Sequence, residues 1–179
     1  MILLQQDRIG CGAYSDVFRP AGTGALVYKL FISGRHERNL SQLCDDTPEA
    51  RLQRQNTFAA ECEAYVLAGR DPWLRLHIPG SFMRCHIADV RDAACVSVSD
   101  RYMLDRCYAI GYISGKDRKL GALRAVGCVP PHIKEALLEF RARGICYLED
   151  VSIFFHDDPE RFIFIDFATN DFPPGNHVD

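Results

Sequence analysis

RIGCGAYSDVF, residues 8–18, decides the fold, because two glycines one residue apart stand between two short apolar segments. A glycine pair between two strands lets backbone N–H groups approach phosphate oxygens with no Cβ in the way. The same spacing is also common in plain hairpin turns, so the stretch by itself leaves a phosphate loop and a simple turn both open. The rest of the chain has to decide between them.

The size and charge of the chain narrow the classes of function. Its 179 residues and 20.2 kDa fit one domain, or one domain with two unequal lobes. The net charge of -3 provides no basic field, so we expect no nucleic-acid partner. No apolar run is long enough for a membrane span or a signal peptide, so we expect a cytoplasmic protein without a membrane partner. The cysteines form no C-x-x-C pair and predict reduced thiols.

The N-terminal part of the sequence is typical of a small sheet. Residues 2–9, 16–19 and 24–32 are short apolar runs separated by Gly and Pro, which predicts three strands of an antiparallel meander. Residues 33–50 are polar and predict a loop or the irregular start of a helix.

Residues 51–69 predict a helix that Gly69 ends. Apolar residues recur there at three- and four-residue steps, with polar residues between them. The apolar positions are Phe58, Cys62, Tyr65, Val66 and Ala68, and the polar ones include Arg51, Arg54, Gln55 and Glu61.

Strand-like material returns over residues 78–113, with an alternating VSVS at 96–99 and the apolar run CYAIGYI at 107–113. Residues 114–121, SGKDRKLG, are polar and indicate a linker.

A second helix is predicted from the Pro130–Pro131 pair to about Arg143, and Gly144 ends it. Its shared apolar face contains Ile133, Ala136, Leu137 and Phe140. Two short apolar runs, SIFF and RFIFI, follow, and the HDDPE between them predicts a hairpin turn.

Lys29 and Glu61 are the first candidate partners of the glycine pair. Lys29 lies among apolar residues in the third predicted strand, where an ammonium can meet phosphate oxygens beneath the loop. An inward cation needs an anion to fix it, and Glu61 in the middle of the helix can provide one, with Glu63 as a close alternative. Taken singly, a strand lysine is usually a surface residue.

Carboxylates near the C-terminus are the second set of candidates. Asp166 directly follows an apolar strand, where it can hold Mg²⁺ against the β- and γ-phosphates of a nucleotide. Glu149 and Asp150 stand before the hairpin that leads to Asp166, and one of them can accept the proton of an attacking hydroxyl.

The ordered series resembles the protein-kinase-like superfamily. RIGCGAYSDVF resembles its glycine-rich loop, with Ser15 in place of the third glycine, and VYK and FAAECEAY resemble the motifs with the nucleotide lysine and its glutamate. CYAIGYISG is similar to the hinge that holds adenine, GICYLEDVSIFF to the catalytic loop, and IDFA to the metal-binding triplet DFG. No single match is specific, but their order along the chain is.

The resemblance implies an α+β, two-lobed kinase-like fold that binds ATP and Mg²⁺. Residues 1–113 would form an N-lobe with an antiparallel sheet, one helix and the hinge, and residues 114–179 a reduced helical C-lobe with a short β-hairpin. The implied catalytic residues are Asp150, Glu149 and Lys29, and the implied metal ligands are Asp166 and Ser152. The other implied nucleotide contacts are Gly10, Gly12, Ser15, Val17, Glu61, Gly111, Tyr112 and Ile113.

The sequence departs from the family's pattern in two places. The catalytic loop is shorter, which puts Ser152 where a metal-binding Asn is expected and leaves Asn170 or Asp171 as alternative ligands. Counting from Gly144 selects Glu149 as the base, whereas the acid type selects Asp150, which we favour. Only residues 167–179 follow Asp166, so no chain remains for the helical subdomain that grips peptide substrates in the family.

We therefore expect a minimal ATP-dependent kinase that transfers the γ-phosphoryl group to a Ser or Thr hydroxyl of a protein. Compact bacterial kinases, including effectors delivered into host cells, have a similarly reduced C-lobe, so a host location and a host substrate are alternatives. A pseudokinase that acts by docking and a small-molecule kinase are the alternative functions. The interpretation requires Lys29 and Asp166 to face one cleft.

Overall fold

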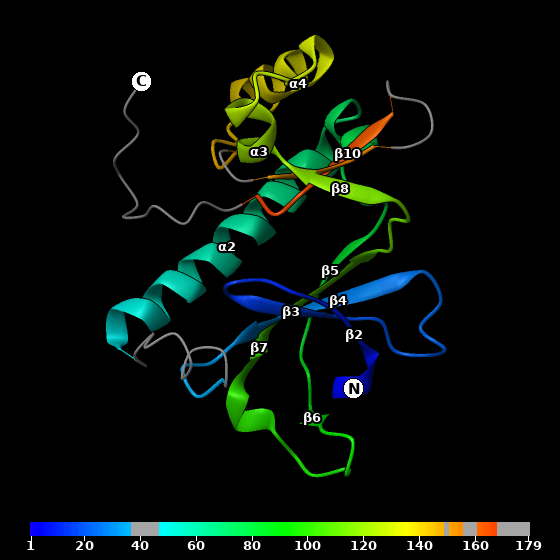
Figure 1. Cartoon of the computed structure of the whole chain (residues 1–179), viewed down its shortest axis with the longest axis vertical. Coiled ribbons are helices and arrows are strands. Elements are labelled where there is room, and N and C mark those ends of the chain that lie inside the picture. Colours follow the sequence, from blue (N-terminus) through cyan, green and yellow to red (C-terminus); the bar gives the residue numbers. More distant parts are fainter. Residues whose placement is uncertain (37–46, 149–150, 156–160, 168–179) are drawn as a thin grey trace. The chain divides into compact units, whose positions relative to one another are not determined.

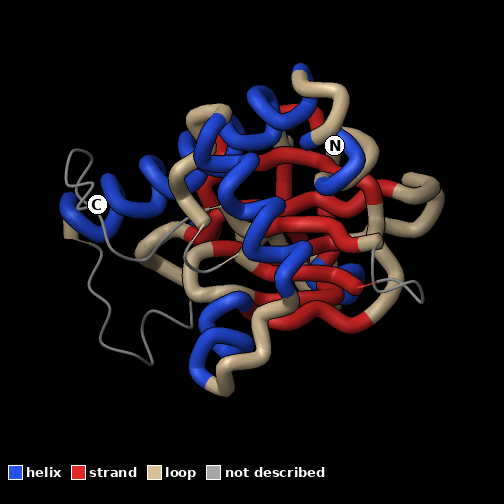
Figure 2. The backbone as a smooth tube through the Cα atoms, turned by 90° about the horizontal axis from the view of Figure 1, so that it is seen from above, coloured by secondary structure: helices blue, strands red, loops and turns tan. Residues whose placement is uncertain are grey.

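The computed structural model describes residues 1–36, 47–148, 151–155 and 161–167. Regular helices and strands make up most of this described chain (Figure 2). The chain divides into two compact units by its internal contacts. Unit 1 contains residues 1–58 and 80–112, and unit 2 contains residues 59–79 and 113–179. Helices and an antiparallel sheet occur together, so the predicted α+β class is confirmed.

Unit 1 is built on a five-stranded sheet of strand order β2-β3-β4-β7-β5, in which all neighbours are antiparallel (Figure 1). β2, β3 and β4 follow one another along the chain, so an antiparallel meander is confirmed, although its first strand is Arg8–Cys11 and not residues 2–9. The five strands are β2 (Arg8–Cys11), β3 (Ser15–Phe18), β4 (Leu26–Ile32), β5 (Phe82–Cys85) and β7 (Tyr102–Gly111).

The prediction of a single strand over residues 2–9 is wrong. The segment is interrupted by a 3₁₀ turn, η1 (Gln5–Asp7), and its first part, β1 (Ile2–Leu4), pairs in parallel with β6 (Asp89–Arg91) in a separate two-stranded sheet. The polar run of Gln5, Gln6 and Asp7 has no apolar side chain to bury, which is why the strand stops there.

The central strand β4 is buried on both faces of the sheet. Tyr28, Leu30 and Ile32 belong to a cluster of buried hydrophobic residues in unit 1. Phe31 has the opposite orientation and meets Phe58 edge to face, with 5.5 Å between ring centroids. Successive side chains of a strand point to opposite faces, so burial of both parities explains the continuous apolar run of this segment.

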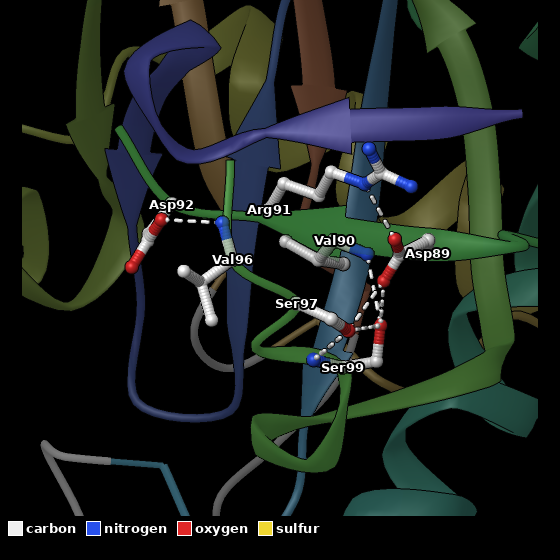
Figure 3. A network of polar contacts seen from close by, with 7 residues as sticks. All are labelled: Asp89, Val90, Arg91, Asp92, Val96, Ser97 and Ser99. Carbon is white, nitrogen blue, oxygen red and sulfur yellow. Dashed lines mark hydrogen bonds and ion pairs between the residues drawn. The ribbon is translucent and has the colours of Figure 1, made fainter. Parts of the chain in front are cut away.

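The VSVS alternation at 96–99 does not form the predicted strand. This segment contributes a single bridge, between Arg91 and Ser97, and Ser99 begins the 3₁₀ helix η3 (Ser99–Arg101). The alternating serines instead bind a carboxylate: the hydroxyl groups of Ser97 and Ser99 each donate to Oδ1 of Asp89 at 2.6 Å (Figure 3). These two bonds, together with the Arg91 guanidinium, lower the pKa of Asp89 far below its usual range.

The long helix α2 (Pro48–Arg70) confirms the predicted helix and contributes residues to both units. The predicted apolar positions are buried except Val66, which is 39% exposed. Two of its polar positions, Arg54 and Glu61, are buried, at 3% and 2% exposed, and for Glu61 this agrees with the predicted inward position. Arg54 lies one helical turn before Phe58 on the same face, so its position on the buried stripe follows from the helical period.

Unit 2 contains a three-stranded antiparallel sheet of order β10-β9-β8 and two further helices. The predicted hairpin is confirmed by the pairing of β9 with β10, whereas residues 156–160 lie outside the described residues. The second predicted helix is confirmed with its four buried apolar residues. The elements are β8 (Lys116–Lys119), β9 (Ser152–Phe155), β10 (Phe162–Ile165), α3 (Leu120–Ala125) and α4 (Pro131–Ala142).

The prediction of a linker over residues 114–121 is wrong, because this segment contains β8 and the start of α3. The exposed side chains of Asp117, Arg118 and Lys119 bear no apolar pattern, and the strand is held by backbone pairing with β9. A hydropathy pattern detects a strand only when one face of the strand is buried. In β8 none of these three side chains is buried, so the pattern misses the strand.

The seven cysteines in the described part of the chain are free thiols. Across those same residues, no helix is long and apolar enough to cross a membrane.

His77 gives unit 2 a predictable dependence on pH. It ends the 3₁₀ helix η2 (Leu74–His77), stacks on Phe162 with 4.3 Å between ring centroids, and donates from Nδ1 to the Phe162 carbonyl oxygen at 3.3 Å. Burial lowers its pKa below 6.5, although the bond to Phe162 acts in the opposite direction. Below pH 6.5 the unfolded chain therefore binds more protons than the folded one, and stability is lost as the pH falls through the lowered pKa.

We expect His77→Phe to reduce the loss of stability between pH 7.5 and 5.5. The phenyl ring keeps the stacking surface but cannot be protonated, and urea midpoints at both pH values measure the difference. His86→Gln, at an exposed histidine, is the matched control. An unchanged pH dependence in His77→Phe would contradict the assignment.

Candidate functional site

The β2–β3 hairpin contains Gly10 and Gly12, and the fold itself requires neither glycine. Neither residue has a positive φ angle. A Cβ added at Gly10 would meet Val17 at 3.7 Å, and one at Gly12 would meet the Ser15 carbonyl oxygen at 3.7 Å, both ordinary contacts. The hairpin is closed by a bond from Gly12 N–H to the Ser15 carbonyl oxygen at 2.8 Å, which any residue except proline can make. A plain turn therefore does not explain the glycines.

The register of the sheet places the first glycine and the candidate lysine on one row. Gly10 pairs with Val17, Val17 pairs with Lys29, and Lys29 pairs with Tyr108. Residues on one such row present their side chains to the same face of the sheet. Gly10 and Lys29 are two strands apart, about 10 Å at the usual strand spacing.

Lys29 is a buried cation in an aromatic environment. It is 9% exposed, and its Nζ lies 5.7 Å from the ring centroid of Phe31 and 6.0 Å from that of Tyr108. Both rings are within the range of cation–π attraction, which offsets part of the cost of removing the ammonium from water. The prediction from sequence that this lysine is aimed inward agrees with its burial.

Glu61 and its alternative Glu63 differ sharply in burial. Glu61 is 2% exposed on α2, whereas Glu63, two residues further along the helix, is exposed. Both belong to unit 2, and Lys29 belongs to unit 1. A buried carboxylate needs partners and an exposed one does not, so burial favours Glu61 as the functional acid.

The predicted adenine contacts lie at the end of β7. The N–H of Gly111 donates to the Ser81 carbonyl oxygen at 3.2 Å, and the N–H of Tyr112 donates to Ala25. A Cβ at Gly111 would approach the Gly80 nitrogen to 3.4 Å, at the near limit of an ordinary contact. These N–H groups are used inside unit 1, and Ile113, the remaining predicted contact, belongs to unit 2.

Asp166 directly follows β10 and has an unusual backbone conformation, with φ of 61°. The next residue, Phe167, is fully buried and packs edge to face on Tyr65 at 5.2 Å and stacked on Phe140 at 5.6 Å. Aspartate tolerates the left-handed region better than most residues. The strand on one side and the anchored ring on the other therefore hold Asp166 in a conformation that is typical of functional positions.

In the three-stranded sheet of unit 2, a row of paired residues brings two polar side chains to Asp166. Lys119 pairs with Ser152 across β8 and β9, and Ser152 pairs with Ile165, the residue before Asp166. The ammonium of Lys119 and the hydroxyl of Ser152 each donate to Oδ2 of Asp166 at 3.0 Å. The Asp166 side chain stays 29% exposed, so solvent and ligands can reach it.

The residues around Asp166 fit a magnesium ion held in part by phosphates. Mg²⁺ prefers hard oxygen ligands and commonly uses one or two protein carboxylates plus substrate phosphates. The accessible carboxylate of Asp166 and the adjacent Ser152 hydroxyl are such oxygens, and the carboxylate already holds one cation, the ammonium of Lys119. Within the described ranges no three acidic, histidine or cysteine side chains are grouped as a metal cage, so Asp166 would depend on phosphate oxygens for the other ligands.

Glu149 and Asp150, the two predicted bases, lie outside the described residues, and so do Asn170 and Asp171. The choice between Glu149 and Asp150 stays a prediction. Lys29 and Asp166 belong to different units, so the requirement that they face one cleft also stays a prediction.

Lys119 is the site residue that sequence reasoning missed, because residues 114–121 were expected to be a linker. Its only sequence signal is a basic residue directly before the apolar Leu120, which begins α3. The strand register that aligns Lys119 with Ser152 is a tertiary property, so hydropathy could not reveal it.

No protein-family model matches the chain, and no curated protein sequence matches it.

Proposed function

We propose that the protein is a minimal kinase, with a two-lobed kinase-like fold, that transfers the γ-phosphoryl group of ATP to a Ser or Thr hydroxyl of a protein. The observation that carries the proposal is the cross-strand row of Gly10, Val17 and Lys29. It puts Gly10, a glycine that the fold does not need, on the same row of the sheet as a buried ammonium. Phosphate oxygens, which accept from backbone N–H groups and attract an ammonium, explain both features at once.

The chemistry assigned to the remaining residues follows from what each can do to charge and protons. Lys29 binds the α- and β-phosphate oxygens, and Glu61 orients Lys29. Mg²⁺, when bound at Asp166, neutralises negative charge on the β- and γ-phosphates. Asp150, with Glu149 as the alternative, accepts the proton of the acceptor hydroxyl. Transfer depends mainly on position and electrostatics, so few protein groups are needed.

Lys119 adds a cation that the transfer reaction can use. Its ammonium is bound to Asp166 and its side chain is 44% exposed, so a phosphate oxygen held beside that carboxylate would be within its reach. A second positive charge beside the γ-phosphate stabilises the negative charge on the leaving oxygen and on the oxygens of the transferred phosphoryl group.

The second candidate function is a pseudokinase that binds nucleotide without transferring phosphate. The shortened catalytic loop favours it, because Ser152 stands where the kinase-like family has a metal-binding Asn. A serine hydroxyl is also a weaker magnesium ligand than an amide oxygen.

The test is incubation of the purified protein with γ-labelled ATP, Mg²⁺ and either a bacterial or a eukaryotic lysate, followed by mass spectrometry of labelled products. We expect Mg²⁺-dependent label on Ser or Thr of a protein. Nucleotide binding without label in any product supports the pseudokinase, label on a small molecule supports a small-molecule kinase, and absence of nucleotide binding contradicts all three.

Substitution of the second glycine tests the phosphate loop directly. We expect Gly12→Ala to fold normally, because its Cβ would make only ordinary contacts, and to weaken ATP binding by about tenfold or more by obstructing N–H bonds to phosphate. Titration calorimetry with ATP and Mg²⁺ measures the affinity. Gly121→Ala, where the new Cβ meets nothing within 4 Å, is the matched control. Wild-type affinity in Gly12→Ala would remove the glycines from the site.

A further inference from the structure

Unit 1 contains a cavity of about 430 Å³ that the proposed nucleotide site does not use. Its lining residues all belong to unit 1 and come from the turn after β4, the first half of α2 and the N-terminal half of β7 with the turn before it. Pockets of this size are typical of small-ligand sites.

The cavity exists because β4 and β7 separate at one point of the sheet. Leu30 pairs with Cys107, but Ile32 pairs with Tyr102, so β7 has more residues than β4 between these two pairs. The extra residues form an irregular segment, and those from Met103 to Arg106 all line the cavity. Strand irregularities of this kind often lie next to functional sites.

The charge of the lining is predominantly positive. Four guanidinium groups contribute to it, from Arg35, Arg51, Arg54 and Arg106, against two carboxylates, Asp100 and Asp105. Asp105 already accepts a bond from Arg106. The excess of two positive charges matches the dianion that a phosphate monoester forms near neutral pH.

Arg54 is the lining residue that most strongly indicates a bound anion. It is 3% exposed, and its Nε and Nη1 have no hydrogen-bond partner among the residues that the structure describes. A guanidinium stays charged at every physiological pH and carries only donors. Burial of such a group without an acceptor costs free energy, so a bound anion would stabilise the folded protein.

We propose that this cavity binds a phosphate monoester, with Arg54 as its central ligand and Arg35, Arg51 and Arg106 around it. Guanidinium groups form paired, charge-assisted hydrogen bonds with phosphate oxygens, which explains four arginines rather than lysines. The cavity is larger than an inorganic phosphate ion needs, so it accommodates the organic group to which the phosphate is attached. The proposal is independent of the kinase assignment.

The test is calorimetric titration of the full chain at constant ionic strength with three probes: inorganic phosphate, glycerol phosphate and a capped phosphoserine peptide. We expect all three to bind, with glycerol phosphate or the peptide tighter than inorganic phosphate. The tighter of the two identifies a small metabolite or a phosphorylated chain as the source. The unphosphorylated peptide should not bind.

Substitutions then locate the site. We expect Arg54→Gln to weaken binding by at least about tenfold, because hydrogen bonds to charged groups contribute most of the affinity of such a site. Arg35→Gln, at an exposed lining residue that is safe for folding, should weaken it several-fold. Arg70→Gln, an exposed arginine in the last turn of the same helix and outside the cavity, is the matched control.

Three results would overturn the proposal. The first is no binding of any phosphate probe by the wild-type chain. The second is equal weakening in Arg35→Gln, Arg54→Gln and Arg70→Gln, which would indicate nonspecific attraction. The third is loss of binding in Lys29→Met with none in Arg54→Gln, which would assign the phosphate to the nucleotide site.

Discussion

Asp166→Asn should reduce phosphoryl transfer by at least about 100-fold while the protein stays folded. A bound metal ion lowers the free energy of the transition state by several kcal/mol, because it neutralises the charge that develops there. An amide holds Mg²⁺ far less well than a carboxylate does. Asparagine is the right replacement because it tolerates the positive φ of 61° at this position, whereas alanine would add backbone strain. Initial rates of label transfer from ATP at saturating Mg²⁺ measure the effect.

Asp117→Asn is the matched control, because Asp117 is an exposed carboxylate on β8 of the same small sheet. It should keep the wild-type rate. Lys29→Met, which keeps the aliphatic stem between Phe31 and Tyr108, should lose transfer to a similar extent if both residues act on one nucleotide. Robust transfer by Asp166→Asn would refute its role as the metal ligand.

Phe140→Ala should destabilise the protein by about 3–5 kcal/mol, the usual cost of truncating a buried phenylalanine. Phe140 is fully buried on α4 and contacts Phe164 edge to face at 5.2 Å and Phe167 stacked at 5.6 Å. The second contact is with the neighbour of Asp166, so the loss of the ring should also loosen the turn that contains Asp166. Urea unfolding measures the free-energy change.

Leu138→Ala is the control, because it truncates a side chain on the same helix that is 64% exposed. It should change the free energy of unfolding by no more than about 0.5 kcal/mol. Similar losses in the two variants would mean that the aromatic cluster around Phe140 does not hold unit 2 together.

Helices and strands with a regular spacing of apolar residues, or with Gly or Pro at their ends, were predictable from the sequence. The meander, the two main helices and the C-terminal hairpin all follow from apolar spacing and from Gly and Pro at the ends. The burial of Lys29 was also predictable, because an apolar run continues on both sides of it. These features depend on residues that are close together in the chain, so the sequence is enough to predict them.

Features that depend on pairing between distant segments were not predictable. The strand β8 has no apolar alternation, and the VSVS serines bind Asp89 instead of forming a strand. Arg54 was assigned to the polar side of its helix, although it stands one turn from Phe58 on the buried stripe. A charged side chain at a buried position is missed by any pattern that equates charge with solvent.

The sequence by itself determined the types of element, their order and the candidate residues of the phosphate loop, because each depends on side chains a few positions apart. Only the tertiary structure decided which residues share a row: Gly10 with Lys29 in the large sheet, and Lys119 with Ser152 beside Asp166 in the small one. Register is fixed by which distant strands bury each other's surfaces, and a shift of one residue reverses every side chain.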